Sequence, residues 1–489
     1  MIKRAFASLA AFVFALSLLA PLPVSAKNSY TYNIEFEPVP SPPVYQTLRI
    51  VDGLNLECGP FKGATDLHVD RLDRVFILDA GNKRVVVLND SFDVVKVIDT
   101  FKYKGKDEEI SANASGVFFH NAQDLLYIAD IDNNRIVICD MDGDIKNIFG
   151  MPDSVLLDSE VEYRPQRIVV DNLGVMFIIS ANIHDGILMV NGENEYLGIF
   201  GRNDIKRTFA VLLEFARRSF MTAEMRAKNA TTFQPTTFQN IFWSHNRFLY
   251  AVSHRTATIN AEVSKFNAMG ETMLFGRDGS LFVDFGNLGL GSDNRIGSIT
   301  CDRNNIFTLL DEASGKLFQY DENCSLIGIF GGSGNTKETF NRPVAVESLG
   351  DNGLILVLDS SKNILSVLEP TYFGRMIREN IVLFNIGRFQ ESLDGWREVL
   401  SINPNYYLAY AGIGKVYYQN EEYREAMTFF KMAQDKDNYS LAKAGLIEEN
   451  VRRFFPLISA AVVLAMIMIM AGGPLKDMVF RKKKGARSK

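Results

Sequence analysis

The sequence of 489 residues predicts a multidomain chain: an all-β six-bladed propeller, then an α-helical repeat segment, then a single transmembrane helix. Three observations predict this organisation. A β-rich segment recurs about every fifty residues, a helical pattern recurs after 34 residues, and an apolar stretch without charges lies near the C-terminus. With 47% hydrophobic and 22% charged residues, most of the chain can bury a core.

The N-terminus has the composition of a signal peptide. Lys3 and Arg4 precede an apolar run over residues 5–19, and small residues follow at 24–26. A basic start, a short apolar core and a small-residue cleavage site are typical of secretory signal peptides. We therefore expect residues 1–26 to direct export, with an uncleaved anchor as the alternative, and residues 27–371 to form the exported propeller.

The β-rich repeat is marked by an acidic residue. DAGNKRVVVLN begins at Asp79 and DIDNNRIVICD begins at Asp130, and the later segments have Ser180, Ser253, Asp311 and Asp359 at the same position. Each unit holds four short strands bounded by Gly, Asn or Asp. Four-stranded units that repeat at this period are the blades of a β-propeller.

The sixth unit is incomplete, because helix-like sequence begins after its third strand. Residues 45–51, YQTLRIV, form a strand-like stretch before the first unit. We expect this stretch to supply the missing strand and close the ring.

A set of polar residues recurs with the blades and is therefore predicted to be structural: Asp79, Asn82, Arg84, Asp130, Asn133, Arg135, Asp311 and Asp359. A catalytic residue is needed once, whereas a residue that builds a blade is needed in each. We expect the carboxylates to accept backbone N–H groups in the strand turns and the arginines to pair with an adjacent blade. No cofactor is expected; the alternative is a ring of carboxylates that binds a cation, with calcium as the candidate.

This region resembles the NHL-repeat β-propellers over about residues 45–370. The resemblance rests on Asp-x-x-Asn-x-Arg at 79–84 and 130–135 and on GGSGNTKETFNRP at 331–343. Blade three has Ser180 in place of the acidic residue, and blade four, LYAVSHRTATINAEV, departs from the pattern.

Residues 203–232 interrupt the repeat between the third and fourth blades. Their apolar residues recur at helical spacing and their basic residues outnumber the acidic ones. We expect a basic amphipathic helix there, either packed on the rim of the propeller or docked to a partner. Arg217 and Arg218 are the candidate partner-binding residues.

Residues 372–453 show a helical pattern that repeats with an offset of 34 residues. Phe389 aligns with Tyr423 and Trp396 aligns with Phe430. This period and these packing positions resemble tetratricopeptide repeats. The resemblance implies a groove that binds other proteins; a rigid stalk is the alternative.

Residues 454–474 predict a transmembrane helix, because the apolar run at 456–473 is long enough to cross a bilayer. The tail 475–489 has seven basic residues and one acidic residue, so it should remain cytoplasmic. The formal net charge is −6. Without this tail and without Lys3 and Arg4 the exported part is near −14, which argues against nucleic acid as a partner.

No catalytic motif stands out, and the four cysteines lack the spacing of a zinc site. Cys301 and Cys324 fall in one repeat, where they either form a disulfide or remain free thiols. The leading hypothesis is a membrane-anchored extracytoplasmic scaffold of a bacterium, accessory to a membrane transport or envelope complex, with transporter subunits as candidate partners.

Two alternatives remain. One is a metal-dependent lactonase-like or lyase-like enzyme that uses histidines in the axial channel, drawn from His68, His120, His184, His245 and His254. The other is a carbohydrate-binding or cell-wall-binding module that uses exposed aromatic residues such as Phe242 and Trp243.

Overall fold

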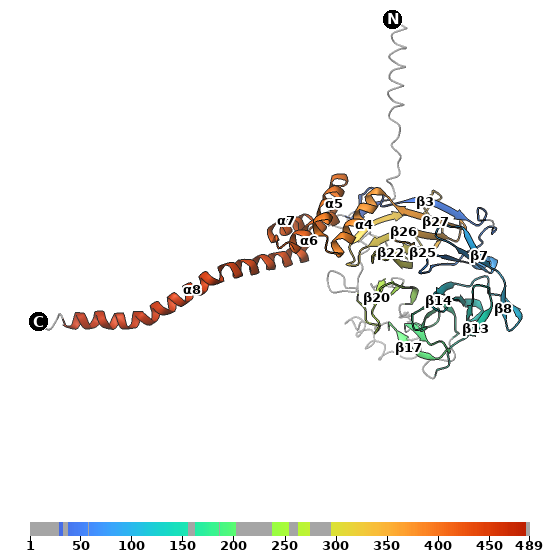
Figure 1. The fold of residues 1–489 in the computed structure, drawn as a ribbon, viewed down its shortest axis with the longest axis horizontal. Coiled ribbons are helices and arrows are strands. Elements are labelled where there is room, and N and C mark those ends of the chain that lie inside the picture. The colour runs from blue at the N-terminus through green and yellow to red at the C-terminus, as the bar shows by residue number, and fades with distance from the viewer. Residues whose placement is uncertain are drawn as a thin grey trace, which may run out of the picture. The chain divides into compact units, whose positions relative to one another are not determined.

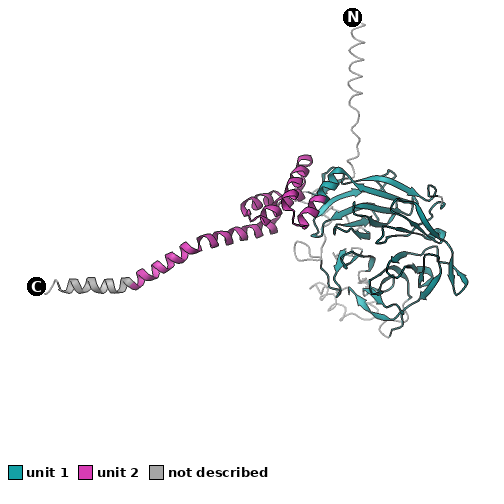
Figure 2. Cartoon of the chain, viewed as in Figure 1, with its two compact units in different colours: residues 1–378 teal, residues 379–489 magenta. Residues whose placement is uncertain are grey.

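The computed structural model describes residues 29–32, 38–56, 58–154, 162–184, 186–201, 237–253, 263–273 and 295–485. The chain divides into two compact units, residues 1–378 and residues 379–489 (Figure 2). The division lies inside helix α4 (Tyr372–Asn385), so the first turns of this helix belong to the first unit. The predicted signal peptide and the insertion at 203–232 lie outside the described residues.

The first unit is a six-bladed β-propeller, as the repeat predicts (Figure 1). The first blade contains β4 (Asp66–Val69), β5 (Val75–Asp79), β6 (Arg84–Leu88) and β7 (Val94–Ile98), and the second contains β10 (Gly116–His120), β11 (Leu125–Asp130), β12 (Arg135–Cys139) and β13 (Ile145–Phe149). The third contains β14 (Pro165–Val170), β15 (Met176–Ser180), β16 (Ile187–Val190) and β17 (Tyr196–Phe200), and the fourth contains β18 (Phe238–Trp243), β19 (Leu249–Ser253) and β20 (Val263–Phe266). The fifth contains β21 (Ile296–Cys301), β22 (Phe307–Asp311), β23 (Lys316–Tyr320) and β24 (Leu326–Gly331), and the sixth contains β25 (Pro343–Leu349), β26 (Leu354–Asp359) and β27 (Ile364–Pro370). Each of the six marker positions is the last residue of the second strand of its blade.

The N-terminal segment closes the ring. Strand β3 (Tyr45–Asp52) pairs antiparallel with β27 and so becomes the outer strand of the sixth blade, the pairing expected for residues 45–51. Strands β1 (Tyr30–Tyr32) and β2 (Pro38–Pro40) extend the fifth blade beyond β24. The innermost strand of each blade lies beside that of the next, and β25 lies beside β4. A hairpin of β8 (Phe101–Tyr103) and β9 (Lys106–Glu108) lies between the first two blades in the sequence.

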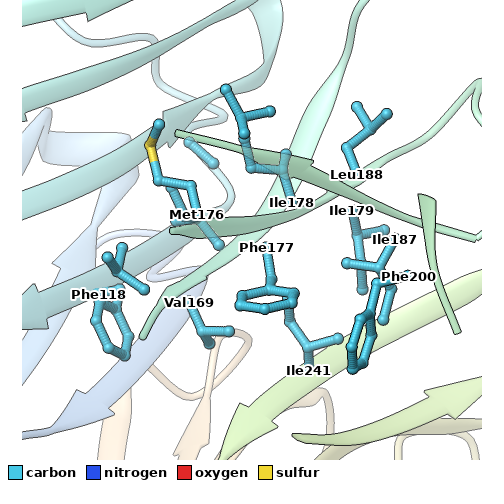
Figure 3. Packing of buried hydrophobic residues seen from close by; sticks show 14 of the residues in the cluster. Phe118, Val169, Met176, Phe177, Ile178, Ile179, Ile187, Leu188, Phe200 and Ile241 are labelled. Carbon is cyan, nitrogen blue, oxygen red and sulfur yellow. The ribbon is translucent and has the colours of Figure 1, made fainter. Parts of the chain in front are cut away.

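The core of the propeller lies between the blades. The second and third strands of each blade are buried on both faces and are therefore rich in Val, Ile, Leu and Phe. Figure 3 shows Phe118, Val169, Phe177 and Ile241, which come from β10, β14, β15 and β18 of three successive blades. Because each blade covers its neighbour, no blade can bury both faces alone.

The second unit is helical. It contains the end of α4, then α5 (Phe389–Ile402), α6 (Tyr407–Gln419), α7 (Tyr423–Met432) and α8 (Lys436–Gly485). Helices α5 and α7 begin 34 residues apart, as the repeat predicts. Trp396 of α5 packs on Gly412 and Phe430 of α7 packs on Gly414, where a Cβ atom would lie 2.5 Å and 2.7 Å from these rings. The glycines of α6 thus let large aromatic residues approach its backbone.

Helix α8 continues without a break from the helical repeats into the apolar stretch. Its residues 436–470 form the one candidate membrane span in the described part of the chain, with a mean hydropathy of 2.2 in the most apolar window. None of that window is buried within the protein.

Candidate axial site

The marker carboxylates fasten the chain at the entry to each blade. Asp79 accepts the backbone N–H of Lys62 at 2.7 Å and side-chain N–H groups of Asn82 and Arg84 at 2.8 Å and 2.7 Å. Another N–H group of Arg84 donates to the carbonyl oxygen of Gly59 at 3.0 Å. One buried carboxylate therefore joins a strand turn to the connection that leads into β4.

The second blade repeats this arrangement. Asp130 accepts the backbone N–H of Ser111 at 2.9 Å and bonds with Asn133 and Arg135 at 2.7 Å and 2.9 Å. Arg135 also pairs with Glu108 at 3.1 Å. In both blades the arginine contacts the connection that precedes its own blade, so the expected pairing with an adjacent blade is wrong.

The later markers hold the same connection. Asp311 accepts the backbone N–H of Arg295 at 3.0 Å, and Asp359 accepts that of Asn341 at 2.7 Å. Arg295 and Asn341 lie just before the innermost strand of their blades. Asp311 also accepts the backbone N–H of Ala313, in the turn after its own strand, at 3.0 Å. Each carboxylate is committed within its own blade.

The innermost strands of all six blades surround a narrow cavity of about 100 Å³ on the propeller axis. Its lining includes three of the five histidines, His68, His120 and His245, together with the buried carboxyl groups of Asp66 and Glu347. His184 lies in a turn after β15, and His254 lies outside the described residues. The ring thus brings together side chains that are far apart in the sequence.

Glu347 and His68 form the most perturbed pair in this cavity. Thr300 donates a hydrogen bond of 3.0 Å to one Glu347 oxygen, and the other oxygen lies 4.0 Å from Nδ1 of His68. Burial raises the pKa of Glu347 well above its usual value and lowers the pKa of His68 to about 4. The His68 imidazole is therefore unprotonated at neutral pH, and burial favours the protonated form of the Glu347 carboxyl group beside it.

Asp66 lies at the other end of the cavity. Its carboxylate accepts the backbone N–H of Val117 at 2.8 Å, and its second oxygen lies 3.9 Å from Nε of Arg167. Burial raises the pKa of Asp66, and Arg167 opposes that shift. The Nε atom of Arg167 is buried and has no hydrogen-bond partner among the described residues.

Polar contacts between blades cross one end of the axis. Arg71 of the first blade donates to Asn172 of the third at 2.7 Å. Arg303 of the fifth blade binds Asp73 of the first and Asp351 of the sixth, each at 2.9 Å. The contacts of Arg71 with Asn172 and of Arg303 with Asp73 tie non-adjacent blades together, and that of Arg303 with Asp351 joins neighbouring blades.

The aromatic residues considered for carbohydrate binding are inside the propeller. Phe242 and Trp243 belong to β18 and line the axial cavity. The indole of Trp243 lies 5.4 Å from the ring of Phe177. They are partly buried packing residues of this strand, not an exposed face.

Metal ligands do not gather in the described part of the chain: no three His, Cys, Asp or Glu residues there form a group that could hold an ion. All four cysteines are free, so Cys301 and Cys324 do not form a disulfide. Arg217 and Arg218 lie outside the described residues.

Sequence reasoning missed Asp66, Arg167 and Glu347. A signal was present, because each interrupts an apolar innermost strand: DLHV, RIVV and VAVESL. Asp66 and Arg167 occupy the same position in their blades, because each pairs with the residue just before the marker, Leu78 and Ile179.

Neither a protein-family model nor a curated protein matches the sequence. Among solved structures, the chain is similar to virginiamycin B lyase from Staphylococcus aureus, at 11% identity and a TM-score of 0.41, over 67% of this chain and 99% of that one. It is also similar to hydrazine synthase of Kuenenia stuttgartiensis, at 9% identity and a TM-score of 0.39, over 64% and 96%.

A third similar structure is the extracellular domain of a hybrid two-component system from B. thetaiotaomicron, at 11% identity and a TM-score of 0.36, over 62% of this chain and 33% of that one. Similarity at this level carries no argument about activity. The class of protein is therefore defined by the structure itself: a six-bladed β-propeller followed by a helical segment that ends in an apolar helix.

Proposed function

We propose that this chain is a single-pass membrane protein that presents its propeller and helical repeats outside the cytoplasm as a binding scaffold. The observation that carries the proposal is the exposed apolar part of α8. Large apolar side chains from Phe454 to Met470 are 46–79% exposed. The eighteen uncharged residues at 456–473 make a helix about 27 Å long, close to the thickness of a bilayer core.

The orientation follows from charge. Four consecutive basic residues at 481–484 follow the apolar part of α8, and such clusters stay on the cytoplasmic side. We expect green fluorescent protein fused after Lys489 to fluoresce and alkaline phosphatase at the same site to be inactive. The reverse pattern would place the C-terminus outside and refute the orientation.

The partner is proposed to be a membrane protein complex, with transporter subunits as the first candidates. An NHL-type propeller and tetratricopeptide-type repeats would offer two protein-binding surfaces, held near the membrane by α8. This assignment and a bacterial origin rest on the sequence resemblance and the tail charges.

Cross-linking in intact cells, mild detergent extraction and mass spectrometry test the scaffold. A stoichiometric membrane partner is expected, and charge reversal of both Arg217 and Arg218 should reduce its recovery. The matched control is Arg247→Glu, an exposed arginine of the propeller with no side-chain ion pair among the described residues. A protein that is extracted alone would count against the scaffold.

A second candidate is proton-transfer chemistry in the axial cavity. The buried Glu347–His68 pair favours it, because buried groups with shifted pKa values gather at active sites. The described residues do not supply a metal-ligand cluster, so the proposed proton transfer relies on these two side chains. A screen of lactones with the purified chain tests this candidate. Hydrolysis that persists in Glu347→Gln would show that the Glu347–His68 pair is not responsible for the activity.

A further inference from the structure

A second and larger cavity lies at the end of the axis where the innermost strands begin. Its volume is about 450 Å³, and Arg167 lines both this cavity and the narrow one. We call it the wide mouth. It is large enough for a small organic molecule, whereas the narrow cavity beneath it has room for only a few water molecules.

The innermost strands of four blades are irregular where they border the wide mouth. Pairing with the second strand skips one residue in β14, β18, β21 and β25, so each strand has a β-bulge near its start. The extra residues are Gln166, Gln239, Gly297 and Val344, and all four line the wide mouth. Bulges re-aim side chains and recur beside binding sites.

The lining is rich in positive charge. Arg167, Arg295 and Arg342 face the wide mouth, and Glu312 is the acidic residue among the described lining residues. Glu312 lies over Gly297, where a Cβ atom would be 2.0 Å from its carboxylate oxygen. All three arginines act on the Glu312 carboxylate electrostatically, whereas burial raises its pKa. Asp66 lies 3.9 Å from Arg167, so Arg295 and Arg342 carry the positive charge that has no ion-pair partner among the described residues.

Two of the three arginines, Arg295 and Arg342, are positioned through their backbones and have no ion-pair partner among the described residues. The backbone N–H groups of Arg295 and Arg342 are held by the marker carboxylates of Asp311 and Asp359, at 3.0 Å and 3.3 Å. Among the described residues, neither of these two guanidinium groups has a hydrogen bond or an ion pair. Arg167 differs, because its Nε lies 3.9 Å from the Asp66 carboxylate and another of its N–H groups donates to the carbonyl oxygen of Gln166 at 3.3 Å. The repeat thus fixes the backbone and leaves the donor groups available.

We infer that the wide mouth binds a small organic molecule that carries a carboxylate or phosphate group. Guanidinium groups pair with both oxyanions in a two-pronged geometry, which suits a ligand between Arg295 and Arg342. Gln166 and Gln239 would bind its neutral polar atoms. This inference is independent of the membrane scaffold, which can stand or fall without it.

Isothermal titration of the detergent-solubilised full chain at low ionic strength tests the inference. The probes are citrate and glucose 6-phosphate, with neutral glucose as the uncharged comparison. Saturable binding of at least one anion is expected, and which anion binds distinguishes a carboxylate ligand from a phosphate ligand. Glucose should not bind comparably.

Variants distinguish this site from any other. The double variant R295A/R342A should weaken anion binding by at least about tenfold, because each charge-assisted hydrogen bond is lost. Glu312→Gln should tighten it by roughly two- to fivefold, since a repelling charge is removed. Arg247→Ala is the matched control and should bind as the unmodified chain does. No anion binding, equal binding of glucose, or unchanged affinity in R295A/R342A would each overturn the inference.

Discussion

Replacing Arg378 with methionine tests how the start of α4 is fixed to the propeller. The Arg378 side chain is 8% exposed and binds Asp302, whose side chain is 5% exposed. A second N–H group of Arg378 donates to the hydroxyl oxygen of Tyr45 at 3.3 Å. Tyr45 in turn donates to the carbonyl oxygen of Gly353 at 3.0 Å. One guanidinium group therefore joins α4 to the fifth blade through Asp302 and to β3 of the sixth blade through Tyr45.

The expected loss of stability depends on the Asp302 carboxylate, which loses its charged partner. In Arg378→Met the Asp302 carboxylate stays buried and keeps backbone N–H bonds from Asn304 and Ile306, each of 2.9 Å. Removing one partner of a buried ion pair costs about 3–5 kcal/mol. At roughly 2 °C per kcal/mol for a unit of this size, the Tm should fall by about 6–10 °C.

Thermal unfolding of the detergent-solubilised full chain, followed by far-ultraviolet circular dichroism, measures this change. The double variant D302N/R378M should recover much of the loss, because no unpaired charge remains buried. Arg388→Met is the control, since Arg388 forms an exposed pair with Glu391 and its loss should leave Tm unchanged. A Tm for Arg378→Met equal to that of this control would refute the reasoning.

Three other changes test the remaining features. Glu347→Gln should raise Tm more at pH 8 than at pH 5. Because burial raises the folded-state pKa of Glu347, the unmodified chain loses stability as the pH rises above the unfolded-state pKa of 4.5. A difference in Tm that does not depend on pH would contradict this. Asp130→Asn should cost about 2–3 kcal/mol in chemical denaturation, because Ser111 and Arg135 lose a charged partner, whereas the exposed Asp142→Asn should not. Val51→Asp places a charge in the buried core of β3 and should abolish the cooperative unfolding of the whole propeller in calorimetry; a separate transition confined to one blade would argue against closure by this strand.

The propeller could be predicted because its signal is local and repeated. Each marker stands at the end of a strand, and the spacing of the markers counts the blades. The strand at 45–51 could be assigned by elimination, since the sixth unit lacked an outer strand. These inferences need only the repeat pattern and the number of strands in each unit.

The axial residues could not be predicted in the same way. Asp66, Arg167 and Glu347 lie in three different blades and meet because the ring brings their strands to one axis. In four of the blades a β-bulge then shifts the register of the innermost strand by one residue. The residues at the bulges are of different types, so the sequence does not reveal their positions. The domain boundary also lies within α4, since Arg378 belongs to the propeller although a helical pattern begins at 372.

The pairing of β3 with β27 also limits when the propeller can finish folding. Residues 45–52 leave the ribosome early, whereas their partner at 364–370 is made more than three hundred residues later. Contacts between such distant segments form slowly. If the chain is exported N-terminus first, the ring must stay open until residue 370 has crossed the membrane, and until then the edges of its end blades lack their partners. Any chaperone that protects these edges would therefore act from translocation until β3 and β27 have paired.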